Sequence, residues 1–236
     1  MRTDGRENLE LRNVNIEVGP MEFAYGSVII STGKTKVLCS ATVEDRVPSF
    51  LLGSGQGWIT AEYSMLPGST SPRTSRDNRS RGRSQEIQRL IGRSLRAGTD
   101  LTKLGERTIT IDCDVLQADG GTRTAAITGG YVALRIAVLR LVDRGLLSND
   151  SLPVNVAATS VGIFEDEVLL DLCYAEDASA DADFNIVMAG DGTIIEIQGG
   201  AEKNRFRRAT VEKVLDAALL GIDELIKTQD ILLSNL

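Results

Sequence analysis

Short apolar segments separated by turn residues make up the first part of the chain. Residues 27–30 and 37–43 alternate or run apolar over a few positions, with glycines marking the turns beside them. Segments of this length and composition predict meandering β-strands. A glycine-rich loop at residues 53–57 leads into a further predicted strand at residues 59–65.

Two helices are predicted in the same part of the chain. Apolar residues recur at helical spacing over residues 87–95, which predicts an amphipathic helix. The apolar run at residues 109–116 predicts a strand, and it leads into a long apolar helix over residues 124–147. The sequence Asp143-Arg144-Gly145 is a stop signal near the end of this helix.

The second part of the chain repeats this order of strands followed by a helix. A polar stretch at residues 148–153 is the best candidate boundary. Strands are predicted at residues 154–161, 168–174, 184–188 and 194–197, and a closing helix at residues 208–227. This order predicts an α+β fold of two packed subdomains, residues 1–150 and 151–236.

Composition bounds the class of protein. The 236 residues are 42% hydrophobic, and no segment reaches the roughly 18 to 20 uncharged residues of a membrane span. The N-terminus has no apolar core of a signal peptide, so we expect a cytoplasmic protein with no membrane partner. Three widely spaced cysteines, Cys39, Cys113 and Cys173, are predicted to be buried thiols. The absence of histidine excludes a Ser-His-Asp hydrolase and a paired-histidine nuclease.

Charge is unevenly distributed along the chain. The net charge is −7, yet eight arginines and only two acidic residues lie between Arg73 and Arg96. That segment has a local balance of +6, so the rest of the chain carries −13. A concentrated basic segment on an acidic body predicts one localised site for a polyanion.

The segment Asp119-Gly120-Gly121-Thr122-Arg123 combines a strand end, a glycine turn and a helix start. The first turn of a helix has unpaired N–H groups and partial positive charge, which suits phosphate, and an arginine adds a planar fork of donors. The alternative is a plain turn in which the glycines supply positive φ and Thr122 caps the helix.

Four acidic residues lie within eight positions between two predicted strands, at Glu176, Asp177, Asp181 and Asp183. Accessible carboxylates separated by small residues suit a hard cation such as Mg²⁺. The alternative is a solvated acidic turn. A phosphate site, a carboxylate pair and an arginine-rich surface together favour phosphoryl transfer on RNA or DNA.

Several segments resemble the ribonuclease PH family over nearly the whole chain. The similarity is densest at residues 104–125, which include the glycine turn. Further matching segments are residues 2–6, 43–48, 57–67, 86–93 and 196–199. This resemblance implies the ribonuclease PH fold, of the ribosomal protein S5 domain 2-like type. It also implies a phosphate-dependent 3′-to-5′ exoribonuclease that releases nucleoside diphosphates reversibly.

The resemblance also implies site residues. Inorganic phosphate, the co-substrate, is expected to bind at Arg83, Gly121, Thr122 and Arg123. Asp177 and Asp183 are expected to bind Mg²⁺ or to give a proton to the leaving 3′-oxygen, whereas Asp181 stands where relatives often have glutamate. A loop at residues 199–206 departs from the family pattern. Candidate RNA contacts are Arg73, Arg76, Arg79, Arg81, Arg89, Arg93 and Arg96.

The implied partners are RNA and further copies of this chain. The family suggests trimming of nucleotides beyond the CCA end of tRNA precursors, with rRNA 3′ ends as a further substrate, by a homohexamer built as a trimer of dimers. For the arginines, a solvated surface is the alternative. For the protein, the alternatives are a non-catalytic RNA-binding ring subunit of exosome type and a hydrolytic nuclease that uses two metal ions.

Overall fold

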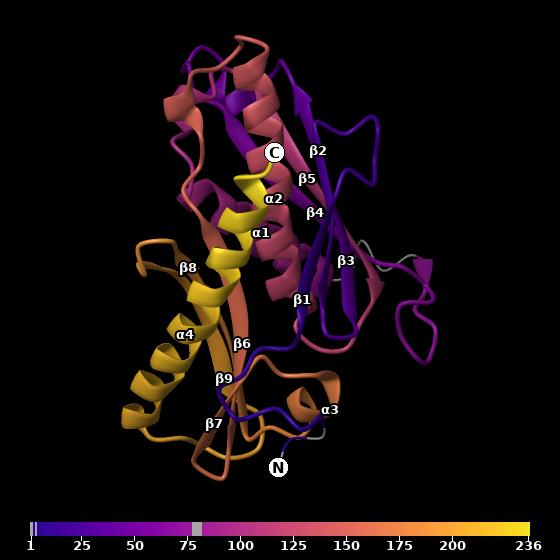
Figure 1. Cartoon of the computed structure of the whole chain (residues 1–236), viewed down its shortest axis with the longest axis vertical. Coiled ribbons are helices and arrows are strands. Elements are labelled where there is room, and N and C mark those ends of the chain that lie inside the picture. Colours follow the sequence, from indigo (N-terminus) through magenta and orange to yellow (C-terminus); the bar gives the residue numbers. More distant parts are fainter. Residues whose placement is uncertain (1, 3, 77–81) are drawn as a thin grey trace.

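A five-stranded sheet is built from the first half of the chain (Figure 1). The computed structural model describes residues 2, 4–76 and 82–236. The strands are β1 (Val14–Val18), β2 (Gly26–Thr32), β3 (Thr35–Glu44), β4 (Trp58–Met65) and β5 (Thr108–Gln117). They lie in the order β1, β2, β3, β5, β4, and only β4 and β5 pair in parallel. The helix α1 (Gly82–Ala97) makes the crossover that this parallel pair needs.

The second half forms a four-stranded antiparallel sheet. Its strands are β6 (Val156–Phe164), β7 (Glu167–Leu170), β8 (Ala182–Ala189) and β9 (Ile194–Ala201). They lie in the order β7, β6, β8, β9. A single helical turn, α3 (Tyr174–Asp177), lies between β7 and β8. In the described part of the chain, short 3-10 turns lie in the connections at Ser49–Leu51, Leu101–Lys103 and Asn149–Ser151.

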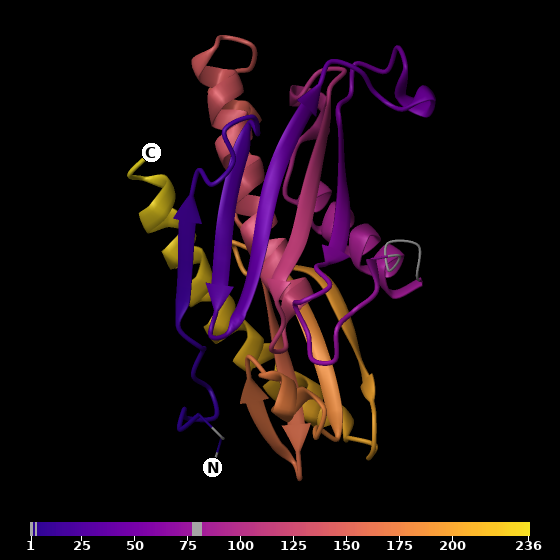
Figure 2. The same ribbon diagram turned by 90° about the vertical axis from the view of Figure 1, so that its right-hand side faces the viewer.

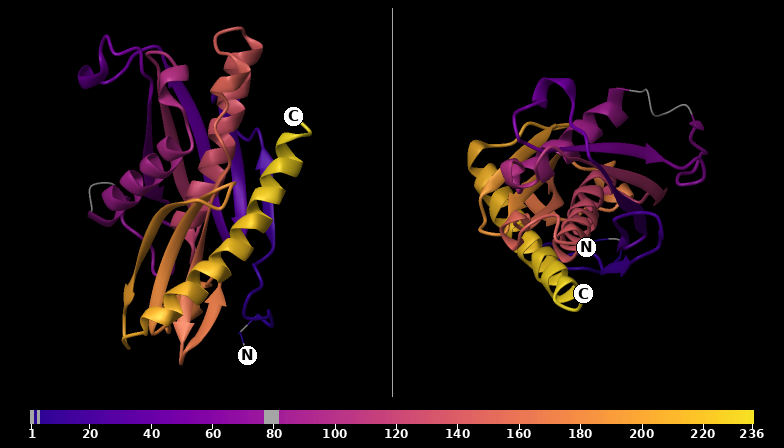
Figure 3. Two further views of the ribbon diagram at one scale, coloured as in Figure 1. Left: turned by 90° about the vertical axis from the view of Figure 1, so that its left-hand side faces the viewer. Right: turned by 90° about the horizontal axis from the view of Figure 1, so that it is seen from above.

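Two long helices and α1 pack the sheets into four layers. The helix α2 (Thr122–Asp143) contacts β2 and β3 on one side and β6 on the other. The helix α4 (Arg208–Leu233) covers the outer face of the second sheet through β6, β7 and β8. The order of layers is therefore sheet, α1 with α2, sheet, and α4 (Figures 2 and 3).

The strand β6 is covered on both faces, which explains its nearly continuous apolar sequence. Ala158 belongs to the core cluster around α2, whereas the preceding residue, Ala157, faces the opposite side of the sheet and belongs to the cluster beneath α4. By length and composition α2 could cross a membrane, but 78% of its most apolar window is buried between the sheets. A helix that is apolar on all sides and enclosed in this way is a core helix.

The predicted α+β fold is confirmed, with local corrections. The helix α2 begins at Thr122 and ends at Asp143, because Gly145 adopts a positive φ of 69° just beyond it. The predicted strand at residues 168–174 is wrong after Leu170. There Asp171 turns the chain with a φ of 54°, and a helical turn follows. All three cysteines are buried and free, as predicted. The boundary between residues 150 and 151 stays a prediction.

Candidate active site

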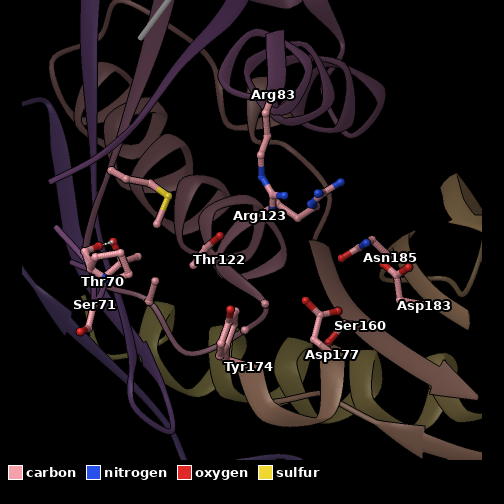
Figure 4. Close-up of a pocket in the computed structure, with 15 residues that line it drawn as sticks. Thr70, Ser71, Arg83, Thr122, Arg123, Ser160, Tyr174, Asp177, Asp183 and Asn185 are labelled. Atoms are coloured by element: carbon pink, nitrogen blue, oxygen red, sulfur yellow. Dashed lines mark hydrogen bonds between the residues drawn. The ribbon is translucent and has the colours of Figure 1, made fainter. Parts of the chain in front are cut away.

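A cavity of about 420 Å³ brings together both halves of the chain (Figure 4). Its walls come from the start of α1, the turn before α2, the short helix α3 and the strand β8. All six residues expected to bind phosphate or to act in catalysis line it. They are Arg83, Gly121, Thr122, Arg123, Asp177 and Asp183. Residues that lie as far as 100 positions apart in the sequence therefore share one site.

The glycine turn at Gly120 and Gly121 has the positive φ angles that the sequence predicts, 73° and 63°. A Cβ at Gly120 would lie 2.5 Å from the Leu172 carbonyl oxygen, so the turn packs directly against the segment before α3. The alternative in which Thr122 caps the helix is wrong in this respect. Gly121 is the N-cap, and the Thr122 hydroxyl instead shares a 2.8 Å hydrogen bond with the Tyr63 hydroxyl. This bond holds the Thr122 side chain at the cavity wall.

Two arginines enter the cavity from neighbouring helices. The Arg83 side chain extends from α1 toward Arg123 at the start of α2, and both guanidinium groups lie across the cavity from the aspartates (Figure 4). Arg123 donates to the Gln198 amide oxygen at 3.2 Å and lies 3.7 Å from the Glu86 carboxylate. These neighbours orient the guanidinium while leaving the cavity-facing side of this basic pair available to an anion.

The two aspartates reach the cavity from different elements. Asp177 ends α3, and Asp183 lies on β8, where Ala182 and Phe184 point into the core and Asp183 and Asn185 line the cavity. Desolvation raises the pKa of the Asp177 carboxyl, and the negative charge of Asp183 raises it further. The arginines on the opposite wall act in the other direction.

The donor set fits a hard divalent cation. Two carboxylates and the amide oxygen of Asn185 line the same wall, and oxygen ligands of this type are those that Mg²⁺ prefers. A cation at this wall would offset the repulsion between Asp177 and Asp183 that the raised pKa reflects. In the described part of the chain no group of three or more acidic or cysteine side chains is placed to hold a metal ion, so the fit rests on the aspartate pair.

An N-terminal arginine cluster lies behind the cavity, and the charge pattern did not reveal it. Arg12 makes a two-point ion pair with Asp171, at 2.6 and 3.0 Å, and donates to the Asp119 carbonyl at 2.6 Å. Arg2 makes a similar pair with Glu176, at 2.8 Å for both bonds. Arg12 thereby stabilises the glycine turn through Asp119. Arg2 and Arg6 stabilise α3 through Glu176, which directly precedes Asp177.

The predicted RNA-binding arginines lie mainly outside the cavity. Arg93 makes a two-point ion pair with Glu196 of β9, and the Arg96 guanidinium stacks 4.3 Å above the Trp58 ring. Both are therefore engaged within the chain, whereas Arg89 is exposed. Arg73 and Arg76 lie in the loop before α1, and Arg79 and Arg81 lie outside the described residues. A role in RNA binding stays a prediction for all seven.

Asp181 does not line the cavity, and its carboxylate instead holds neighbouring segments by hydrogen bonds. Its carboxylate accepts hydrogen bonds from the Glu165 backbone N–H at 2.9 Å and from the Asn204 amide at 2.7 Å. These bonds anchor the loop that departs from the family pattern. Gly200 lies at the end of β9, where it pairs with Asp183 of β8, and a Cβ at Gly200 would meet nothing within 4 Å.

Sequence reasoning missed several residues that line the cavity. Asn185 could have been found, because it lies two positions after Asp183 on the same face of a strand. Tyr174 was missed because its segment resembled a strand. Tyr63 does not line the cavity but holds Thr122 there, and it gave no signal, because a core tyrosine and one that holds Thr122 have the same sequence context.

Comparisons with known proteins agree with this geometry. A family model described as the 3′ exoribonuclease family, domain 1, matches residues 10–140, and the model for domain 2 of the same family matches residues 155–220. The chain belongs to the 3′ exoribonuclease family. Ribonuclease PH of Crocosphaera subtropica is 56% identical over 235 residues, which cover 99% of this chain and 98% of that protein. Ribonuclease PH of Bacillus cereus (strain B4264) is 53% identical over 233 residues, or 97% and 95% of the two chains.

Solved structures support the fold. Rice Rrp46 has a TM-score of 0.79 at 18% identity, and the match covers 97% of this chain and 98% of that one. An Archaeoglobus fulgidus exosome with RNA bound to its active site has a TM-score of 0.79 at 21% identity, covering 96% and 92%. Membership of the 3′ exoribonuclease family, with these two ribonuclease PH relatives, identifies a phosphorolytic 3′-to-5′ exoribonuclease. The non-catalytic ring subunit is the less supported alternative.

The aspartate pair leads to a prediction about pH and stability. Because the folded protein raises the pKa of Asp177, this group stabilises the fold below the ordinary carboxyl pKa of about 3.9, and the contribution is lost as the pH rises through the raised value. At pH 7 without divalent cations, Asp177→Asn is therefore expected to raise the urea midpoint of unfolding. The same variant is expected to lower kcat by about 10²- to 10⁴-fold.

Asp181→Asn is the matched control for this prediction. Its hydrogen bonds with Glu165 and Asn204 lower the pKa of Asp181, so the charged form stabilises the fold above the ordinary carboxyl pKa. This variant is expected to lower the urea midpoint at pH 7 and to keep its activity. Equal losses of kcat in the two variants would show that the loop, and not the cavity carboxylate, is what the reaction needs.

Proposed function

We propose that this enzyme trims the nucleotides that follow the CCA end of tRNA precursors, with inorganic phosphate as the attacking group. The observation that supports the proposal is the cavity in which two arginines and a helix N-terminus face two aspartates. Phosphate and a phosphodiester are both anions, so their approach needs positive charge on one side and an acid or cation on the other. rRNA 3′ ends are a further proposed substrate.

Phosphate is bound in this proposal by Arg83, Thr122 and Arg123. The arginines supply charge and paired donors, while Thr122 and the first backbone N–H groups of α2 supply neutral donors. An oxygen of phosphate attacks the last phosphodiester of the RNA. No histidine base is needed, because phosphate already has a nucleophilic anionic oxygen near neutral pH.

The leaving group departs toward the aspartates. As the new P–O bond forms, the bond between phosphorus and the 3′-oxygen of the preceding nucleotide breaks, and that oxygen takes up a proton. When no cation is bound to it, Asp177 suits a group that gives this proton, because its pKa is raised. The products are a nucleoside diphosphate and an RNA shorter by one nucleotide, and the same groups support the reverse reaction.

Mg²⁺ is the proposed cofactor, held by Asp177 and Asp183. When bound, the ion would supply stabilisation of the charge that develops on the phosphate oxygens. The two carboxylates would hold it at the wall opposite the arginines. The basic residues of the loop before α1 and of α1 itself are proposed as RNA contacts.

A homohexamer, arranged as a trimer of dimers, is the proposed assembly. Several large apolar side chains are exposed on the isolated chain, including Phe23, Phe50 and Leu52, and such surface favours contact with further copies. A solved structure with a similar fold is that of an archaeal exosome core. The cytoplasm is the proposed location, since three free, buried thiols suit a reducing compartment.

Identification of the released nucleotide tests this function. The enzyme is incubated with a tRNA that has a few extra 3′ nucleotides, with Mg²⁺, with and without phosphate. We expect nucleoside diphosphates only in the presence of phosphate, and arrest near the CCA end. Nucleoside monophosphates formed without phosphate would instead support the hydrolytic nuclease, and the absence of any release would support the non-catalytic ring subunit.

A further inference from the structure

One wall of the cavity has no role in the phosphate chemistry. It is formed by Met65, Thr70, Pro72, Ala118 and Tyr174. Tyr174 is the only aromatic residue among the described residues that line the cavity, and 67% of it is exposed. Its ring projects into the cavity between Thr70 on one side and Asp177 on the other (Figure 4).

The Tyr174 ring makes no aromatic pair with another described residue. Among the described residues, edge-to-face aromatic pairs join Phe50 to Trp58 and Phe184 to Phe206, and neither pair includes Tyr174. An aromatic side chain that lines a cavity with most of its surface accessible is available to stack against a ligand in that cavity.

The backbone holds Tyr174 at a fixed place relative to the catalytic carboxylate. Tyr174 and Asp177 are the first and last residues of α3, and residues three apart on a helix lie on one face with Cβ atoms about 5–6 Å apart. The Tyr174 N–H donates to the Asp119 carboxylate at 3.3 Å, and its carbonyl accepts from Ala178 at 3.0 Å. The ring therefore lies one helical turn from the group that faces the leaving oxygen.

We propose that Tyr174 is a stacking platform for the 3′-terminal nucleobase of the RNA, and for the base of a nucleoside diphosphate in the reverse reaction. The inference rests on the proposed function, which places the scissile phosphorus between the arginines and the aspartates. The terminal base is joined to that phosphorus through one ribose only, so it lies beside the charged groups. The ring of Tyr174 is the aromatic surface within that reach.

Stacking on a tyrosine also fits the task of trimming. Every base has a flat π-face, so an aromatic platform accepts all four bases, whereas hydrogen bonds to base edges would select one. Met65 and Pro72 add apolar surface to the same wall without a directed donor. The platform therefore holds successive terminal nucleotides in the same position whatever their sequence.

Two changes test the platform together: removal of the Tyr174 ring from the enzyme and removal of the 3′-terminal base from the RNA. Tyr174→Ala is compared with Tyr174→Phe, which keeps the ring, on two RNAs, one of which lacks the base of its 3′-terminal nucleotide. We expect Tyr174→Ala to lower kcat/KM for intact RNA by roughly 5- to 150-fold, the usual range for one base stacked on an aromatic side chain. KM for phosphate and the melting temperature are expected to stay unchanged, and Tyr174→Phe to behave as the parent.

The abasic RNA supplies the decisive comparison. The parent enzyme is expected to lose about the same factor on this RNA, and Tyr174→Ala to lose nothing more on it. Equal effects of Tyr174→Ala on the intact and the abasic RNA would overturn the proposal, and so would a Phe variant as impaired as the Ala variant.

Equilibrium binding separates this inference from the proposed function. Calorimetric titration of ADP into the parent and into Tyr174→Ala measures base contact without turnover. A roughly 5- to 150-fold weaker affinity of Tyr174→Ala is expected, and equal affinities would exclude the platform. If the parent enzyme released no nucleotide in the presence of phosphate, the proposed function would be refuted. The binding of ADP would then still decide whether Tyr174 contacts the base.

Discussion

Arg123→Ala and Arg83→Ala are each expected to lower kcat/KM for phosphate-dependent nucleotide release by about 10²- to 10³-fold, the usual cost of one lost donor to a developing charge. Both side chains line the cavity opposite the aspartates. Each substitution therefore removes a positive charge and paired hydrogen-bond donors from the side of the cavity that is proposed to bind phosphate. The double variant is expected to have no measurable activity. Release of nucleoside diphosphates from a 3′-extended tRNA measures the effect.

Arg46→Ala is the control for the two arginine variants. The Arg46 side chain is 75% exposed and pairs with Glu44 far from the cavity, so its loss removes one positive charge without touching the site. Its activity and melting temperature are expected to match the parent. If Arg123→Ala released nucleoside diphosphates as fast as Arg46→Ala, the assignment of the phosphate site would be wrong.

Arg12→Met is expected to lower the free energy of unfolding by about 3 kcal/mol, the lower end of the cost of breaking a buried ion pair, because Arg6 stays 3.7 Å from the Asp171 carboxylate. Only 4% of the Arg12 side chain and 7% of the Asp171 side chain are exposed. Methionine keeps much of the aliphatic volume, so the loss measures the ion pair with Asp171 and the bond to the Asp119 carbonyl. Urea unfolding followed by circular dichroism gives the value.

Two further variants define what that loss means. Arg46→Met, at an exposed position, is expected to change stability by no more than about 0.5 kcal/mol. Adding Asp171→Asn to Arg12→Met removes the stranded charge, and asparagine tolerates the positive φ of this position, so part of the loss should be recovered. A midpoint for Arg12→Met equal to that of Arg46→Met would mean that the cluster does not stabilise the fold.

Elements with a clear period were predictable from the sequence. The amphipathic helix α1, the long core helix α2 and most strands follow from local patterns of apolar residues and glycines. The helical turn α3 could not be predicted in this way, because Leu169, Leu170 and Leu172 resemble a strand that continues to Tyr174. The break depends on Asp171, whose positive φ is stabilised by Arg12, a residue about 160 positions away. Local propensity cannot report such a contact.

The site was predictable to the extent that its residues occur in extended motifs. The segment around Gly121 and the aspartate pair resemble a known family, and the structure places these groups in one cavity. Isolated residues gave no comparable signal. Arg2 and Glu176, for example, form a buried pair only because the fold brings the N-terminus behind α3. The charge count placed the basic surface on α1, yet two of its arginines are engaged within the chain.

The contact at Gly120 has a consequence for the alignment of the reaction. The turn before α2 follows the first sheet, and the segment that precedes α3 follows a strand of the second, yet no methyl group fits between them at Gly120. Displacement at phosphorus requires the attacking oxygen, the phosphorus and the departing oxygen to share one axis. Because the two turns touch, we expect small breathing motions of one sheet against the other to move both ends of that axis together.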